Sequence, residues 1–120
     1  MVILDTNILI EILKDNRTCI NKVNRFNTNL AISSISVMEL YFGARNKLEL
    51  KQLEQFVNLF KIEHLSKTIS IKASLLVKLY AKSHSLDIPD SLIAATALTN
   101  NASLFSLNKD FKYIPKLLLI

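Results

Sequence analysis

The amino-acid sequence predicts an α/β fold, a sandwich in which helices cover both faces of a parallel sheet. Short apolar runs of strand length alternate along the chain with longer segments whose apolar residues recur at helical spacing. Acidic residues stand just after several of these runs, at the edge where parallel α/β sheets bind their ligands. We expect residues 1–120 to form one domain.

Composition narrows the class of protein. The 120 residues are 50% hydrophobic, which is enough for a substantial core. No apolar run approaches the length of a membrane span and the N-terminus lacks the features of a secretory signal, so we expect a cytoplasmic protein with no membrane partner. The single cysteine, Cys19, can form no internal disulfide and is expected to be a small, partly buried side chain. A net charge of +5 suits a polyanionic partner such as nucleic acid, although many equally basic proteins bind none.

The first strand is expected at Val2–Leu4, and a helix is expected to follow over residues 7–14. Asp5 and Thr6 lie between the two elements. We expect the Asp5 carboxylate to face solvent at the ligand-binding edge of the sheet. The alternative is that Asp5 or Thr6 only caps the first helix.

The next elements are a short helix that contains residues 20–26 and ends near 27–29, a second buried strand at 30–32 and a helix over 37–44. Ser34 or Ser36 is expected to cap the last of these, and Glu39 lies in its first turns, again just past a strand. Gly43 is the only glycine and falls within the helical run, where it costs about 1 kcal/mol relative to alanine. A close backbone approach is the expected reason for it.

The second half of the chain continues the alternation. Its expected elements are a helix over 48–60, a strand at 62–65, a helix over 67–84, a turn at 86–90, a helix over 91–99, a strand at 103–106 and an edge strand at 117–120. The helix over 91–99 is apolar around most of its circumference, so we expect it to be central. Asp90 lies at its amino end, where capping is the alternative to a functional role. His64 and His84 lack metal-ligand spacing and are expected to be ordinary surface or turn residues.

Four acids fall at the predicted ligand-binding edge, namely Asp5, Glu39, Asp90 and Asp110. Converging carboxylates repel one another unless hard divalent cations such as Mg²⁺ or Mn²⁺ neutralise them. Such ions lower the pKa of a bound water and stabilise the leaving oxygen of a phosphodiester, with no need for His or Cys. The four acids together predict a metal-dependent nuclease, and for each acid alone the alternative is capping or surface placement.

Four stretches of the sequence are more specific, because together they indicate a known protein family. They are Ile3–Leu9 (ILDTNIL), Ile35–Ala44 (ISVMELYFGA), Ile88–Ala97 (IPDSLIAATA) and Ser106–Phe111 (SLNKDF), the last followed by Ile114-Pro115. In this order and spacing the chain resembles the PIN-domain ribonucleases, and specifically the VapC-type toxins of toxin–antitoxin pairs, over essentially its whole length.

The resemblance implies a PIN-like α/β/α sandwich with a four- or five-stranded parallel sheet, and Mg²⁺- or Mn²⁺-dependent endonucleolytic hydrolysis of RNA. It also implies a homodimer, a small cognate antitoxin that covers the acidic site, and contact with operator DNA only through that antitoxin. A catalytically silent PIN domain that binds RNA or serves as a scaffold is the alternative function, and the intact acids count against it. A receiver-like signalling domain is disfavoured because such domains usually pair adjacent acids after the first strand, whereas this chain has a single acid there.

By position, Asp5, Glu39 and Asp90 match the three acids of the family's metal site. Three polar residues match the supporting positions beside them, namely Thr6, Asn7 and Ser36.

The fourth position departs from the family pattern, because Asn108-Lys109-Asp110 is one residue shorter than the common spacing. We expect Asp110 to be the fourth acid of the metal site and Asn108 to support it. The alternative is that Asp110 caps the turn before Phe111 and Asn108 faces the metal.

A carboxylate cluster repels phosphates, so RNA binding requires flanking cations. Arg45, Lys47 and Lys109 are the candidates, and for each the alternative is a solvated surface charge.

Overall fold

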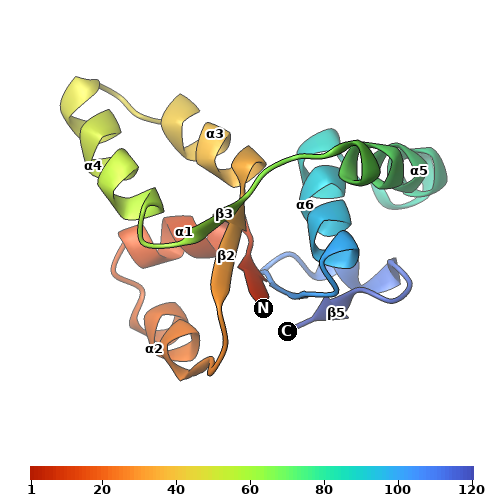
Figure 1. The fold of residues 1–120 in the computed structure, drawn as a ribbon, viewed down its shortest axis with the longest axis horizontal. Coiled ribbons are helices and arrows are strands. Elements are labelled where there is room, and N and C mark those ends of the chain that lie inside the picture. Colours follow the sequence, from red (N-terminus) through yellow and green to blue (C-terminus); the bar gives the residue numbers. More distant parts are fainter.

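The computed structural model describes all residues, 1–120, and contains one five-stranded sheet with helices on both faces (Figure 1). Its strands are β1 (Val2–Leu4), β2 (Leu30–Ser33), β3 (Lys61–Glu63), β4 (Ser103–Phe105) and β5 (Leu118–Leu119). Their order across the sheet is β3-β2-β1-β4-β5, and every neighbouring pair is parallel. The predicted α/β fold with a parallel sheet, including the edge strand near the C-terminus, is confirmed.

Helices lie in the crossover connections between successive parallel strands, as is usual in α/β proteins. They are α1 (Thr6–Leu13), α2 (Arg17–Arg25), α3 (Ser34–Phe42), α4 (Lys47–Val57), α5 (Lys67–His84), α6 (Ile88–Thr99) and the 3₁₀-helix η1 (Lys109–Tyr113). Every predicted element is present, with ends shifted by a few residues. The sequence did not predict η1, because five residues are too few to show a helical period.

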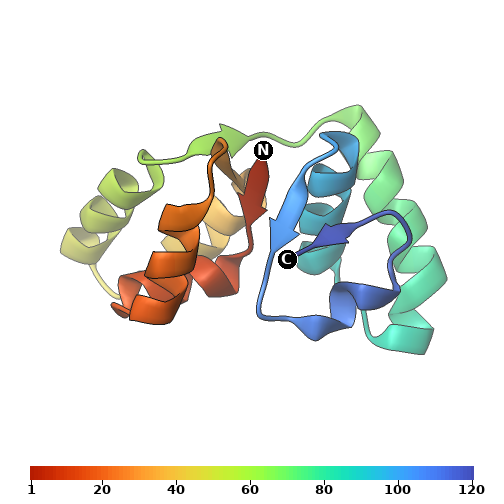
Figure 2. The same cartoon turned by 90° about the horizontal axis from the view of Figure 1, so that it is seen from below.

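Alternation along the strands divides the core between the two faces of the sheet. Ile3 and Leu104 point to a core cluster that also contains the buried side chains of α5 and α6. Leu4 and Phe105 point to a second cluster that contains those of α1, α2 and α4. Cys19 is buried in this second cluster. Figures 1 and 2 show the two groups of helices on opposite sides of the strands.

Helix α6 is central, as its composition predicts. Six of its residues are at most 1% exposed, namely Ser91, Ile93, Ala94, Ala95, Thr96 and Ala97. Small side chains let α6 approach both the sheet and α5 closely, which fixes the position of its first turn. That turn carries Asp90.

The start of α3 differs from the prediction. Ser33 caps the helix, because its side chain accepts a hydrogen bond from the Ile35 backbone N–H at 3.1 Å. Ser34 lies in the first turn and Ser36 is fully buried, so neither is the cap. The helix therefore begins directly at the end of β2, with no connecting loop.

Gly43 ends α3 instead of lying within it, with a φ of −78° that any residue adopts. A Cβ at this position would be 3.5 Å from the Glu39 carbonyl oxygen and 3.6 Å from that of Leu40, which are ordinary contacts. The expected close backbone approach is therefore wrong, and Gly43 lies where helices usually end. No helix of the chain is both long enough and apolar enough to cross a lipid bilayer.

Candidate active site

The carboxyl ends of β1, β2 and β4 form one edge of the sheet, and most of the predicted site residues follow these strands. Asp5 comes directly after β1, Ser106 directly after β4, and α3 begins where β2 ends. Figure 2 shows β1 and β4 pointing the same way, with α1 and η1 beyond their carboxyl ends. This is the edge where ligands bind in open α/β sheets.

Asp5 is buried, with 4% of its surface exposed, which corrects the expectation that its carboxylate faces solvent. Its Oδ1 accepts a hydrogen bond from the Thr6 backbone N–H at 2.7 Å, so Asp5 also caps α1. Its Oδ2 accepts one from the Ser106 hydroxyl at 2.6 Å. Burial raises the pKa of Asp5, and this effect and the charge of Asp87 outweigh the two hydrogen bonds, which lower it.

Ser106 is the residue that orients Asp5 from the other end of the chain. Its hydroxyl donates to Asp5 and accepts from Asn7 Nδ2 at 3.3 Å and from the Asn108 backbone N–H at 2.9 Å. Asn7 Oδ1 in turn accepts from the Leu107 backbone N–H at 3.2 Å. Because one donor and two acceptor positions are all a hydroxyl has, the Ser106 proton is committed to Asp5.

Glu39 is held beside Asp5 by two hydroxyl groups. Thr6 Oγ1 donates to Glu39 Oε1 at 2.7 Å and lies 2.8 Å from Ser36 Oγ. Since the Thr6 proton goes to Glu39, Ser36 is the donor to Thr6. Ser36 is fully buried whereas Glu39 is exposed, so a fixed chain of hydroxyls positions an open carboxylate.

The start of α6 excludes helix capping as the role of Asp90. The helix begins at Ile88 and its cap is Asp87, whose Oδ1 accepts from the Asp90 backbone N–H at 2.8 Å. Asp90 therefore lies within the first turn, and the alternative that Asp90 itself is the cap is wrong. Its carboxylate is free to face the other acids.

The pKa of Asp90 shows that the acids converge. Burial raises it to about 7, with further upward contributions from the charges of Asp87, Asp5 and Glu39 and from a hydrogen bond with Asp87. Asp5 and Glu39 come from other elements, more than 50 positions away in the sequence. The fold therefore gathers four carboxylates into one repulsive field, a pattern typical of functional sites.

At the fourth position Asn108, not Asp110, is the capping residue. Asn108 Oδ1 accepts from the Asp110 backbone N–H at 2.9 Å and caps η1, while Asn108 Nδ2 lies 3.4 Å from Asp90 Oδ2. The alternative that Asp110 caps this turn is wrong. Asp110 is exposed, and its charge contributes to a raised pKa of Tyr113. Lys109 is the exposed first residue of η1.

The two other basic candidates lie in the connection from α3 to α4. Arg45 is exposed and forms an ion pair with Glu49 at 3.0 Å, and Lys47 is the exposed first residue of α4. Neither residue forms an ion pair with a site acid. An RNA phosphate that binds Arg45 would therefore have to compete with Glu49.

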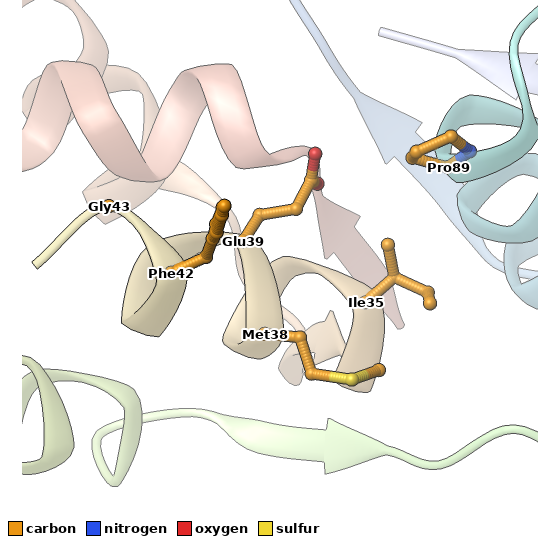
Figure 3. Close-up of a pocket in the computed structure, with 6 residues that line it drawn as sticks. All are labelled: Ile35, Met38, Glu39, Phe42, Gly43 and Pro89. Atoms are coloured by element: carbon orange, nitrogen blue, oxygen red, sulfur yellow. The ribbon is translucent and has the colours of Figure 1, made fainter.

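An apolar groove runs beside Glu39 between α3 and the start of α6. It has a volume of about 490 Å³ and is lined by Ile35, Met38, Glu39, Phe42, Gly43 and Pro89 (Figure 3). Phe42 is 82% exposed and Met38 52% exposed. A large exposed apolar surface next to a polar site is typical of a protein-binding surface.

Two residues of this edge, Asp87 and Ser106, were not predicted from the sequence. Asp87 had a detectable signal, because an Asp two positions before a Pro is a common start of a helix. Ser106 had none. Its role depends on Asp5, which is 101 positions away.

Comparison with known proteins shows the family of the chain. The model of the PIN domain family matches residues 2–117. The chain belongs to the PIN domain family. A comparison with curated protein sequences found no match.

Solved structures give the same PIN fold over the whole chain. A toxin-antitoxin complex from Klebsiella pneumoniae superposes with a TM-score of 0.85 at 29% identity, covering 100% of this chain and 96% of that chain. VapBC2 from Rickettsia felis, bound to a DNA fragment from its promoter, has a TM-score of 0.84 at 29% identity, with 100% and 98% covered. VapBC-1 from nontypeable Haemophilus influenzae has a TM-score of 0.83 at 26% identity, with 100% and 97% covered.

Divalent cations are the cofactors that nucleases of the PIN family generally use, and the donor set suits them. The available ligands are carboxylate oxygens, which hard cations prefer. The pKa of Asp90 is raised by burial and then by repulsion from the neighbouring acids, and a cation would relieve that repulsion. As positioned, no three His, Cys, Asp or Glu side chains lie close enough together to hold one metal ion between them. Mg²⁺ does not need one, because it usually keeps several waters and binds one or two carboxylates.

Proposed function

We propose that this chain is a metal-dependent endoribonuclease that acts as the toxin of a toxin–antitoxin pair. The observation that carries the proposal is the placement of Asp5, Glu39, Asp87 and Asp90 at one edge of the sheet, where burial and then the charges of the other three acids raise the pKa of Asp90. Like charges gathered at a sheet edge lower the stability of the protein, and such clusters are typical of functional sites. Membership of the PIN family over residues 2–117, together with the likeness to VapBC complexes, supports the nuclease and toxin roles, and residues 1–120 then act as one PIN domain.

In this proposal Asp5, Glu39 and Asp90 hold Mg²⁺ or Mn²⁺, and Asp110 tunes the binding from the exposed side. The ion would supply an activated water and charge stabilisation at the scissile phosphodiester. Ser106 and the Thr6 N–H fix the Asp5 carboxylate, and the hydroxyls of Thr6 and Ser36 fix Glu39. Such preorganisation spares the site a rearrangement during the reaction.

RNA is the proposed substrate because the chain as a whole is basic. The net charge of +5 suits a polyanion, and Arg45, Lys47 and Lys109 are the cations proposed to contact phosphates. A catalytically silent RNA-binding or scaffold domain is the second candidate. An active nuclease is favoured because all the carboxylates are intact and hydroxyl groups hold Asp5 and Glu39 in place.

The proposed protein partners are a second copy of the chain and a small cognate antitoxin. Similar chains occur in toxin–antitoxin complexes, one of them bound to promoter DNA, which supports contact with operator DNA through the antitoxin. The exposed groove beside Glu39 supports a protein interface on this side. We place this activity in the cytoplasm, where RNA and the operator are found.

Incubation of purified protein with total RNA tests the activity. We expect internal cleavage in Mg²⁺ or Mn²⁺, none in EDTA, and none with Asp90→Asn, which keeps the shape of the side chain but loses the charge. Leu118→Asn, on the exposed edge strand β5, is the control for purification and carried-over nuclease. Cleavage that persists in EDTA and in Asp90→Asn would refute the metal site, and absence of cleavage in every condition would favour the silent domain.

A further inference from the structure

Three aromatic side chains form a compact cluster where the end of α5 meets η1. The rings of His84 and Tyr113 stack with centroids 3.9 Å apart and an interplanar angle of 25°. Tyr80, one turn earlier on α5, lies 4.9 Å from Tyr113 and 5.7 Å from His84 in tilted and edge-on geometry. We call His84, Tyr80 and Tyr113 the aromatic cluster.

The aromatic cluster has a rigid base and an exposed tip. Tyr80 and Tyr113 are partly buried and pack against the core cluster beneath α5 and α6. His84 is exposed, and its Nδ1 is 2.7 Å from the Ser83 hydroxyl, which fixes the plane of the ring. The imidazole therefore presents an ordered flat surface to solvent, and ordering it in advance reduces the entropic cost of binding.

The aromatic cluster is adjacent to the carboxylates. His84 ends α5, and a single left-handed turn at Ser85, with φ of 57°, leads to the cap and first turn of α6, which carry Asp87 and Asp90. On the other side, η1 runs from its Asn108 cap, in contact with Asp90, to Tyr113. Figure 2 shows η1 beside the end of α5 at this edge of the molecule.

Electrostatics and hydrogen bonding agree with this position. The charges of Asp110, Asp90 and Asp87 all raise the pKa of Tyr113, after a larger contribution from burial, so the phenol lies within their field. The Tyr113 hydroxyl is also buried without a hydrogen-bond partner. An unpaired buried hydroxyl is unfavourable for a purely structural ring and requires an explanation.

We propose that the aromatic cluster binds a nucleobase of the RNA, which stacks on His84 next to the phosphodiester held by the carboxylates. This inference rests on the proposed function, because it assigns a base-binding subsite to the same active site. Proteins bind single-stranded nucleic acid by stacking bases on aromatic rings beside a groove that follows the backbone. Lys82 on α5 and Lys112 on η1 are exposed on the same two elements and can contact the backbone on either side.

The experiment uses short single-stranded RNAs in which 2-aminopurine, whose fluorescence is quenched by stacking, replaces one base at a time. Binding is measured in Ca²⁺ in place of Mg²⁺, and a gel confirms that each strand remains intact. Because stacking on an aromatic side chain contributes about 5- to 150-fold to affinity for each base, we expect His84→Ala to raise Kd by that factor. Quenching at one strand position should be lost with it, and His84→Phe should restore both. His64→Ala, an exposed histidine after β3, is the matched control and should bind as the unmodified protein does.

Three outcomes would overturn the proposal. The first is an unchanged Kd and unchanged quenching in His84→Ala. The second is failure of His84→Phe to restore binding while its melting temperature matches that of the unmodified protein. The third is wild-type protein that quenches no position, which needs no variant and holds even if His84→Ala unfolds.

Cleavage kinetics separate this inference from the proposed function. In Mg²⁺, we expect His84→Ala to raise KM with kcat nearly unchanged and to weaken the base preference at one position next to the cut. If no RNA is cut under any condition, the nuclease proposal fails, whereas the quenching measurement still tests the base-binding subsite. If RNA is cut normally by His84→Ala with the same KM and base preference, the subsite fails and the nuclease remains.

Discussion

At the residue scale, Asp5 accepts two hydrogen bonds that an asparagine cannot both reproduce. An amide has one acceptor oxygen, so in Asp5→Asn either the Thr6 N–H or the Ser106 hydroxyl loses its partner. This loss opposes the relief of a buried charge, and we expect the free energy of unfolding to change by less than about 1 kcal/mol. RNA cleavage should fall by at least about 100-fold, since a lost metal ligand costs several kcal/mol in the transition state. Thermal melts and cleavage rates measured on the same sample check both; a variant that cleaves normally removes Asp5 from the site.

Asp90 gives a pH dependence whose sign follows from its pKa. The pKa of Asp90 is raised from 3.8 to about 7, so the folded protein favours the protonated form. The contribution of Asp90 to the free energy of unfolding is fully present below about pH 4 and is lost as the pH rises through 7. Because Asp90 is only partly buried, solvent screens part of this effect. We therefore expect the free energy of unfolding of the metal-free protein to fall by on the order of 1 kcal/mol, or a few degrees in Tm.

Melts at pH 5 and pH 7.5 measure this effect. Asp90→Asn should flatten the difference, because the amide is neutral at both pH values. Mg²⁺ should do the same in the unmodified protein by stabilising the carboxylate. Equal pH dependence with and without Asp90 would show that another group is responsible.

Asn108 and Asp110 have different roles at the fourth position of the proposed metal site. Asn108 has a structural role and Asp110 an electrostatic one. Asn108 caps η1, so Asn108→Ala should lower stability by about 1 kcal/mol, whereas the exposed Asp110 should tolerate alanine. We expect Asp110→Ala to raise the Mg²⁺ concentration needed for half-maximal cleavage several-fold, less severely than changes at Asp5 or Asp90. Asn108→Asp, which keeps a capping side chain, is the control for the loss of the cap. Magnesium titrations of the three variants decide the assignment, which is wrong if only the changes at Asn108 raise the requirement.

At the element scale, the start of α6 combines two functions in Asp87. The side chain caps the helix, and its charge is the largest contribution after burial to the raised pKa of Asp90. Asp87→Ser keeps a capping oxygen and removes the charge, so we expect it to lower the pKa of Asp90 with little change in Tm. Asp87→Ala should lower that pKa as well, but lose about 1 kcal/mol of stability with the cap. Carboxyl-carbon NMR titration and melts check the two effects; an Asp90 pKa that stays near 7 in both variants would contradict this account.

At the scale of the whole molecule, we expect the basic residues to bind RNA. We also expect two copies of the chain to form a homodimer. Arg45→Glu should weaken RNA binding and reduce the slope of log K against log salt by about 0.7 for each lost contact. Lys61→Glu is the matched control: Lys61 is also exposed and ion-paired, but it lies at the amino end of β3, away from the acidic edge. Equal salt slopes for both variants would place the RNA groove elsewhere. Sedimentation at micromolar concentration should show a dimer, and a monomer would refute that partner.

The features that the sequence determined by itself depend on residues close together in the chain. A run such as Val2–Leu4 predicts a buried strand because side-chain period and apolar character are properties of neighbouring residues. The position of Asp5 and Glu39 just after such strands was enough to place them at the carboxyl edge, because parallel strands share that edge. The alanine-rich α6 was likewise predictable as a central helix.

Only the tertiary structure decided which groups meet and in what state. The hydrogen bond from Ser106 to Asp5 joins residues 101 positions apart. Because Asp87 caps α6, the Asp90 side chain is not used as the cap and lies near the other acids. The burial of Asp5 and the stacking of His84 on Tyr113 likewise come from elements distant in sequence. Hydrogen bonds and pKa shifts depend on distances of a few ångströms and on exclusion of water, and neither quantity is defined until the sheet and its helices have packed.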